Sequence, residues 1–227
     1  MGELKSRFVT MASHEFRTPL SAILSSVSLI GKYTTSDEQE KRNKHIERIK
    51  SSVVNMTEIL NNFLSIGKLE EGQVQCNPSL MDIEEFVKGI VEDVKTLLKS
   101  GQIISYTHIE GVTLVDLDKQ LLKNILLNLV SNAIKYSPED KKIDITTSHR
   151  DKKLSIKVID QGIGISEIDQ KYLFERFFRA KNAENIQGTG LGLNIVKKYA
   201  ELMNAEISLI SELDSGSTFS VEFRLEN

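Results

Sequence analysis

The residues best suited to chemistry near the start of the chain lie in one predicted helix, residues 8–30. Its apolar positions repeat with heptad spacing, which is typical of an amphipathic helix with one face in a core. The positions that share this face are Val9, Ala12, Phe16, Pro19, Ile23, Ser26 and Ile30. His14 is off that face, at roughly 200° around the axis from Ala12. The core therefore does not account for His14, although a surface histidine is the simpler interpretation of this residue taken alone.

The neighbours of His14 strengthen the case for a chemical role. Thr18 lies one helical turn beyond His14 on the same face. Glu15 lies about 100° away around the helix axis, so only a long side chain allows its carboxylate to reach the imidazole. Pro19 lacks an N–H group and crowds the carbonyl of Glu15, so it either ends the helix or bends the turn that carries the histidine. Apolar positions continue to Ile30, which favours the bend.

The segment from His14 to Leu20 reads HEFRTPL. It resembles the phosphoacceptor box of sensor histidine kinases, whose pattern is H-E-x-R-T-P-L. The match is specific because seven positions fit in order within a predicted helix.

Composition limits the possible partners and locations. The net charge is −3 and no cluster of Lys or Arg builds a basic face, so we expect no nucleic-acid partner. Cys76 is the single cysteine, which excludes an internal disulfide and a zinc cluster and suits a reducing cytoplasm. No apolar run approaches the ~20 residues of a membrane span, and no signal peptide is visible. We expect a cytoplasmic chain without membrane contact. A membrane-bound sensor region upstream in the full-length protein is an alternative that the sequence leaves open.

With 227 residues, the chain is long enough for two domains. A turn at residues 31–37, with Ser36 or Asp37 as N-cap, precedes a second helix that runs to about residue 71. Its predicted apolar seam consists of Ile46, Ile49, Val53, Met56, Leu60 and Phe63. Two long helices and a short turn form an α-helical hairpin, and pairing two hairpins as a dimeric four-helix bundle covers both seams. Packing of the hairpin on the rest of its own chain is the alternative.

The remainder mixes helical and strand patterns. We predict a dimerisation and phosphotransfer domain at 1–72, a linker at 73–80 and a catalytic domain at 81–227. The expected helices of the last domain are 82–98, 118–136 and 191–203, and its expected strands lie at 103–108, 113–115, twice within 142–160, at 207–210 and at 218–223. This order predicts an α+β sandwich with helices on one face of a mixed sheet.

Two asparagines lie on one face of the predicted helix 118–136. Asn128 and Asn132 are four residues apart, and Lys135 and Tyr136 follow about one turn beyond. An amide oxygen is a hard neutral ligand suited to Mg²⁺, which usually completes its shell with water and phosphates, and a lysine supplies a compact positive charge for phosphates. Without further signals, a pair of surface asparagines would be the simpler interpretation.

Glycine-rich segments supply those further signals. In DQGIGI, Asp160 follows an apolar strand and could accept a hydrogen bond from an exocyclic amine such as that of adenine, while Gly162 and Gly164 let the backbone approach a flat ring. GTGLGL, residues 188–193, opens the last helix, where free N–H groups form an anion site. The G-x-G-x-G spacing is not a Rossmann fingerprint.

The polar segment 180–187 between them fits a mobile lid. Phe174, Phe177 and Phe178 would anchor it, and Arg179 at its base could reach a terminal phosphate.

These segments follow one another in the order of the nucleotide boxes of the histidine-kinase ATPase domain. The resemblance implies a Bergerat-type (GHKL-type) sandwich that binds ATP with Mg²⁺, with Asn132 on the metal and Asp160 on the adenine. The other residues that it implies around the nucleotide are Asn128, Lys135, Tyr136, Gly162, Gly164, Arg179, Gly188, Gly190, Leu191 and Gly192. Gln161 stands where the family often has Asn, which leaves the role of that side chain open.

The predicted reaction is attack by His14 on the γ-phosphorus of ATP, with Glu15 as base or hydrogen-bond partner and Arg179 neutralising charge. The resemblance then implies transfer to an aspartate of a response-regulator receiver domain, and Thr18 could position water for removing phosphate from that regulator. One alternative is a dimeric signalling scaffold that binds nucleotide without reacting. Another is a chaperone or repair ATPase of the same fold, but those relatives carry a glutamate base where this chain has Asn128.

Overall fold

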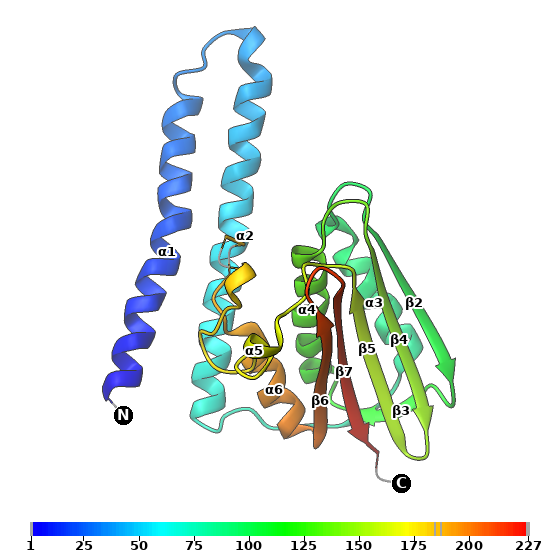
Figure 1. The fold of residues 1–227 in the computed structure, drawn as a ribbon. Helices are drawn as coiled ribbons and strands as arrows, with labels where there is room; N and C mark the ends of the chain where they lie inside the picture. Colours follow the sequence, from blue (N-terminus) through cyan, green and yellow to red (C-terminus); the bar gives the residue numbers. More distant parts are fainter. Residues whose placement is uncertain (1, 184, 187, 226–227) are drawn as a thin grey trace. The chain divides into compact units, whose positions relative to one another are not determined.

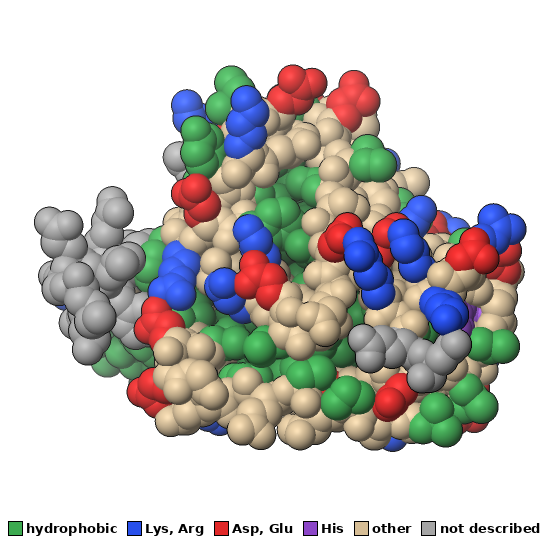
Figure 2. All heavy atoms as spheres, turned by 90° about the horizontal axis from the view of Figure 1, so that it is seen from below, with side chains coloured by type: hydrophobic (Ala, Val, Ile, Leu, Met, Phe, Trp, Pro, Cys, Tyr) green, Lys and Arg blue, Asp and Glu red, His purple; other side chains and the backbone are tan. Residues whose placement is uncertain are grey.

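The computed structural model describes residues 2–183, 185–186 and 188–225, with the side chains of residues 2–11 and 14 outside the description. The chain divides into two compact units, Met1–Glu70 and Glu71–Asn227, and each is described by itself. None of the described helices is both long and apolar enough to cross a membrane. Figure 2 shows Lys and Arg side chains lying among Asp and Glu side chains over the face that it draws.

The first unit is the predicted helical hairpin. Helix α1 (Gly2–Ile30) and helix α2 (Gln39–Glu70) lie antiparallel (Figure 1), joined by a turn with the short 3-10 helix η1 (Ser36–Glu38). Pro19 lies inside α1, so it does not end the helix.

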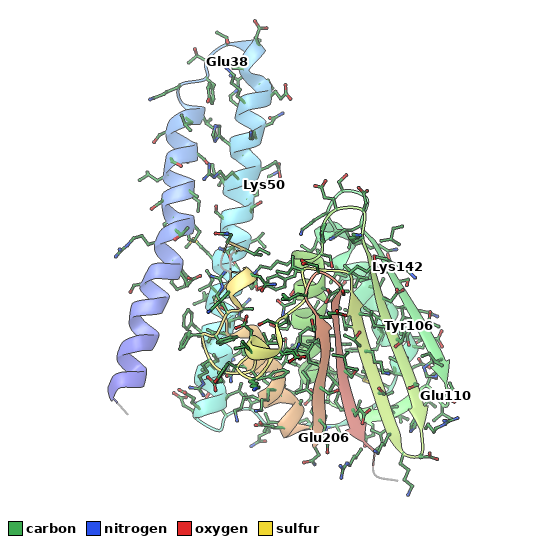
Figure 3. All side chains as sticks on the ribbon, in the orientation of Figure 1. Glu38, Lys50, Tyr106, Glu110, Lys142 and Glu206 are labelled. Atoms are coloured by element: carbon green, nitrogen blue, oxygen red, sulfur yellow. The ribbon has the colours of Figure 1, made fainter. Side chains whose placement is uncertain are left out.

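The N-cap prediction for the second helix was wrong. Thr35 is the N-cap of η1, which runs directly into α2, and it forms a capping box with Glu38, which lies at the end of the hairpin (Figure 3). Arg42 closes the turn by donating to the carbonyl oxygens of Tyr33 and Thr35 at 2.6 and 2.8 Å. The Thr35 side chain and the Glu38 carboxylate thus decide the helix start, rather than Ser36 or Asp37.

The predicted seam of α1 is confirmed from Ala12 to Ile30, and the side chain of Val9 lies outside the described residues. The predicted seam of α2 is only half right. Pro19 and Ser26 are buried, and Phe16 stacks on Phe63 of α2 with ring centroids 6.3 Å apart. The other half of the α2 seam, Ile46, Val53 and Leu60, is between 38% and 50% exposed. The two halves of a heptad seam lie side by side on a helix, and α1 covers only one of them.

The second unit is a two-layer sandwich, which confirms the predicted class. Its five-stranded sheet has the order β2-β4-β5-β7-β6, in which β2 and β4 are parallel and the other neighbours antiparallel. The strands are β2 (Ile103–Glu110), β4 (Lys142–Arg150), β5 (Lys153–Asp160), β6 (Ala205–Glu212) and β7 (Gly216–Arg224). A separate ribbon pairs β1 (Ser79–Asp82) with β3 (Leu114–Leu117), so the last two residues of the predicted linker lie in a strand.

Helices cover one face of this sheet. Helices α3 (Ile83–Val94), α4 (Lys119–Tyr136) and α6 (Gly192–Leu202) pack on β2, β5 and β6 respectively (Figure 1). Two 3-10 turns, η2 (Lys95–Leu97) and η3 (Lys181–Ala183), and the short helix α5 (Glu167–Gln170) complete the described elements. Alternate residues of β5 are buried, and the fully buried side chains between the layers include Leu122, Ile125, Leu129, Ile145, Leu154 and Ile156. This core fixes α4 on the sheet, and α4 carries the predicted asparagines.

Candidate functional site

Helix α4 presents the polar residues at the centre of the candidate site. Asp118 caps its start, accepting hydrogen bonds from the backbone N–H groups of Gln120 and Leu121. The Asn128 side chain donates from Nδ2 to the carbonyl oxygen of Asn124 at 2.9 Å, so its Oδ1 stays available as an acceptor. Within the described part of the chain, the Asn132 side chain has no hydrogen-bond partner. Two amide oxygens can therefore serve a ligand from one face of α4.

The GTGLGL segment lies against the same helix. A Cβ added to Gly192 would lie 2.7 Å from Asn128 Oδ1, and one added to Gly188 would lie 2.7 Å from Lys135 Nζ. The same position at Gly188 lies 3.9 Å from the Tyr136 hydroxyl. The structure thus brings together the asparagine, lysine and glycine residues that the sequence placed about 60 residues apart.

The DQGIGI segment meets the C-terminal end of α4. The Ile163 N–H donates to the carbonyl oxygen of Tyr136 at 3.2 Å, and a Cβ added to Gly162 would lie 2.8 Å from the same oxygen. Both predicted glycine segments therefore meet the C-terminal half of α4, which carries the two asparagines.

Asp160 is held in place at the end of β5. It is 7% exposed, and its Oδ1 accepts from the backbone N–H groups of Gly162 and Ser217 at 2.8 and 3.2 Å. Burial raises the pKa of the Asp160 carboxyl above its ordinary value, and the two N–H groups pull the pKa down. No described residue donates to Oδ2, so one carboxylate oxygen can accept from a ligand.

Several supporting residues escaped the sequence analysis. Ser217 is the strand neighbour of Asp160, and its hydroxyl lies 2.9 Å from that of Ser211. Ser211 Oγ accepts from the Ile165 N–H at 2.9 Å, and Asn182 donates to the carbonyl oxygen of Gly164 at 2.9 Å. The antiparallel pairing of β5 with β7 was the only signal that could have found Ser217.

A hollow of about 770 Å³ opens beside Asp160, between the ends of β5 to β7 and the start of α5. Asp160 is the only predicted site residue in its lining. Glu167 and Glu212 also line it, and their negative carboxylates repel a negatively charged triphosphate. The acidic lining therefore makes this hollow unfavourable for a phosphate group.

The predicted anchors of the lid are fixed to the segment that follows it. The Phe177 N–H donates to the carbonyl oxygen of Gly190 at 3.0 Å, and Asn194 donates to that of Phe174 at 2.9 Å. The Phe178 ring lies 5.7 Å from that of Tyr172. Of the predicted lid, Glu184 and Gln187 lie outside the described residues.

Three further predicted residues have contacts that bear on their roles. Arg179 donates to the carbonyl oxygens of Ala183, at 2.7 Å, and Ile186, so its guanidinium holds the lid backbone here. Leu191 is fully buried, which leaves only its backbone to face a nucleotide. Gln161 accepts from the Lys142 N–H at 3.3 Å.

The phosphoacceptor segment lies in α1. Glu15 is half-buried and Thr18 is exposed. The buried seam position Ser26 lies about two turns beyond Thr18. The His14 backbone is helical, and its side chain lies outside the described residues. Its predicted role therefore rests on sequence.

Gly164 offers a test of the DQGIGI backbone. Its φ is +61°, and an added Cβ would lie 1.8 Å from the carbonyl oxygen of Glu212. We expect Gly164→Ala to lower the free energy of unfolding by about 3 kcal/mol, from left-handed backbone strain and a backbone clash. The measurement is urea unfolding of the 227-residue chain.

Gly89 in α3 is the matched control, because nothing lies within 4 Å of its added Cβ. Gly89→Ala should raise stability by roughly 1 kcal/mol through helix propensity. Equal effects of the two substitutions would contradict the close approach of Gly164 to β6.

Comparison with known proteins matches both units. Residues 4–72 match the His Kinase A (phospho-acceptor) domain, and residues 117–227 match the histidine kinase-, DNA gyrase B-, and HSP90-like ATPase domain. The chain belongs to the histidine kinases. Histidine protein kinase DivJ of Caulobacter vibrioides is 32% identical over 96% of this chain, and sensor histidine kinase YkoH of Bacillus subtilis is 33% identical over 98%.

The matches cover only part of these relatives. The chain spans 37% of DivJ and 48% of YkoH. Among solved structures, full-length ShkA in complex with AMPPNP has a TM-score of 0.69 at 25% identity, over 98% of this chain and 46% of ShkA. The helical hairpin followed by the mixed-sheet sandwich thus also occurs in ShkA.

Proposed function

We propose that the chain is an ATP-dependent protein-histidine kinase that phosphorylates its own His14 and passes the phosphoryl group to an aspartate of a response-regulator receiver domain. The observation that carries the proposal is the convergence of Asn128, Lys135, Asp160 and the 188–192 glycines on the end of one helix. Membership of the family and the AMPPNP complex of ShkA support nucleotide binding.

Different residues of the site bind different parts of the nucleotide. Asp160 accepts from the adenine amine with its remaining oxygen, and the ring lies near Gly162. Lys135 and the N–H groups at the start of α6 bind the phosphates. This division places the γ-phosphate toward the glycine segment and its lid.

The donor set of α4 fits Mg²⁺. No group of three or more His, Cys, Asp or Glu side chains that could hold a metal exists among the described residues. Mg²⁺ usually takes few protein ligands and relies on phosphates and water, so the amide oxygens of Asn132 and Asn128 suffice. When bound, Mg²⁺ neutralises phosphate charge as the γ-phosphoryl group leaves.

In the proposed reaction an imidazole nitrogen of His14 forms a bond to the γ-phosphorus, and the bond to the ADP oxygen breaks. Glu15 orients the imidazole or accepts its proton. In a separate reaction Thr18, one turn along α1, positions a water that attacks the phosphorylated aspartate of the regulator and releases inorganic phosphate. The phosphoramidate that forms on His14 is stable in alkali and labile in acid.

The direct experiment is incubation of the chain with γ-labelled ATP and Mg²⁺. Label on the protein that survives alkali and is lost in acid supports the kinase. Released phosphate without label on the protein would indicate an ATPase, and neither product would indicate a scaffold; both outcomes contradict the proposal. Transfer of label to a purified receiver domain tests the second step.

We further propose that two hairpins pair as a four-helix bundle. Apolar side chains on both helices face solvent in the single chain: Leu20, Leu24 and Val27 on α1, and Ile46, Val53, Leu60 and Leu64 on α2. A patch of this kind is typical of a helix interface.

Val53 provides the test of pairing. We expect a mass of about 51 kDa by light scattering, twice the 25.6 kDa of one chain, and a single-chain mass for Val53→Glu because a buried charge opposes association. Ile210→Glu is the control, since Ile210 is 76% exposed on β6 of the other unit. A dimeric Val53→Glu variant or a monomeric wild type would contradict the proposed bundle.

A further inference from the structure

The C-terminal end of α4 is capped almost entirely by other parts of the chain. The last four carbonyl groups of a helix have no partner within it and need donors from elsewhere. Here the Ser137 N–H donates to the carbonyl oxygen of Ala133, and the Ile163 N–H donates to that of Tyr136. The two carbonyls between them, of Ile134 and Lys135, are served by the side chains of Gln102 and Lys99.

Gln102 is built into this end of the helix. It is only 7% exposed, and its Nε2 lies 3.1, 3.1 and 2.9 Å from the carbonyl oxygens of Ile134, Ser137 and Pro138. Two amide protons are thus shared among three acceptors. Its Oε1 accepts from the Lys99 N–H at 3.0 Å, which fixes the orientation of the amide.

Lys99 adds a charge to the same cap. Its Nζ lies 2.7 Å from the carbonyl oxygens of both Lys135 and Ser137. A cation at a helix C-terminus is favoured by the helix dipole. In the same turn Gly101 has φ +68°, and its added Cβ would lie 1.7 Å from Oδ1 of Asp140, in the segment that follows α4.

The helix cannot cap itself here. Many helices end with a glycine in the left-handed conformation, whose backbone N–H groups satisfy the last carbonyls. In this chain Ser137 is extended, with φ −84° and ψ 139°, and Pro138 has no N–H to donate. The last turn of α4 therefore depends on Lys99 and Gln102.

We propose that Lys99 and Gln102 are positioning residues for the nucleotide site, an inference that rests on the proposed function. The turn that they cap carries Lys135 and Tyr136, and the Tyr136 carbonyl holds the DQGIGI segment through Ile163. Loss of the cap lets this turn fray. A ligand that needs the ordered turn then binds more weakly in proportion to the ordered fraction.

The test uses Gln102→Leu, which keeps the side-chain volume and removes the donors. We expect Kd for Mg·AMPPNP and KM for ATP to rise about tenfold, as for an ordered fraction near one tenth, with kcat within about twofold of wild type. Hydrogen exchange of the Ser137 and Ile163 amides should accelerate more than that of amides in β4 and β5.

Substitutions of Lys99 test the same inference independently, with a second variant that should restore nucleotide affinity. Lys99→Met should raise Kd roughly threefold, and Lys99→Arg, which still donates, should restore it to within about twofold. Val91→Ala is the stability control, because Val91 is a buried core residue of α3 with no place in the cap. It should lower the unfolding midpoint and leave Kd unchanged.

The outcomes separate this inference from the proposed function. Wild-type affinity in Gln102→Leu, or an equal loss of affinity in Val91→Ala, would overturn the positioning role while the kinase proposal stands. A wild-type chain that binds no nucleotide would overturn the proposed function. Amide exchange at Ser137 and Ile163 would still decide whether the cap orders the turn.

Discussion

Replacing His14 with Gln is expected to abolish covalent labelling by γ-labelled ATP, to below about a thousandth of the wild-type level. An amide has no basic nitrogen that can attack phosphorus, whereas a neutral imidazole presents one at physiological pH. Binding of Mg·AMPPNP should stay within about twofold of wild type, because no residue of the proposed nucleotide site lies in the hairpin. The two measurements are label on the isolated protein and a binding titration.

The chain offers matched controls in its other three histidines. His149 is half-buried, and its Nδ1 lies 3.1 Å from the carbonyl oxygen of Val112. His149→Gln should therefore be labelled like the wild type. Label that persists in His14→Gln would mean that another residue accepts the phosphoryl group, and label lost from both variants would point to a general defect.

Residues with local signals were predictable from the sequence. The period of the helices placed Asn128 on the correct helix, and the apolar run before Asp160 placed that residue at the end of the correct strand, because each signal lies within a few residues. The site itself could be anticipated through the order of the motifs. The structure adds that the glycines at 188 and 192 lie against Lys135 and Asn128.

Residues that act through distant neighbours were not predictable. Gln102 caps a helix that ends more than 30 residues later, and Ser217 reaches Asp160 only through strand pairing across 57 residues. Neither residue belongs to a local pattern. Periodicity likewise located the apolar residues of α2, but it could not tell which half of the seam α1 covers. A helix that packs on one neighbouring helix and a helix that packs on two have the same heptad spacing of apolar residues.

Asp160 carries the second large prediction. Asp160→Asn should weaken nucleotide binding by roughly 100-fold, since the carboxylate oxygen that accepts from adenine is replaced by a group that can present donors. The unfolding midpoint should be unchanged or raised. Asn retains an oxygen for the N–H groups of Gly162 and Ser217, and it removes a charge whose burial is unfavourable.

Asp214→Asn is the matched control, because Asp214 is an exposed turn residue with φ +59°, a conformation that asparagine tolerates. It should leave nucleotide affinity unchanged. An Asp160→Asn variant that binds like the wild type would remove Asp160 from the adenine site. One that is strongly destabilised would show that the carboxylate charge supports the fold.

The pH dependence of the same residue separates binding from stability. Because burial raises the pKa of Asp160 above 3.8, the folded chain holds a proton that the unfolded chain has already lost. The contribution of Asp160 to the free energy of unfolding therefore falls as pH rises from 3.8 through the folded-state pKa. Nucleotide affinity should change in the opposite direction, since the ionised carboxylate is the better acceptor. Urea unfolding and binding titrations across this range, taken as differences between wild type and Asp160→Asn, isolate this group, and parallel curves for the two proteins would contradict the assignment.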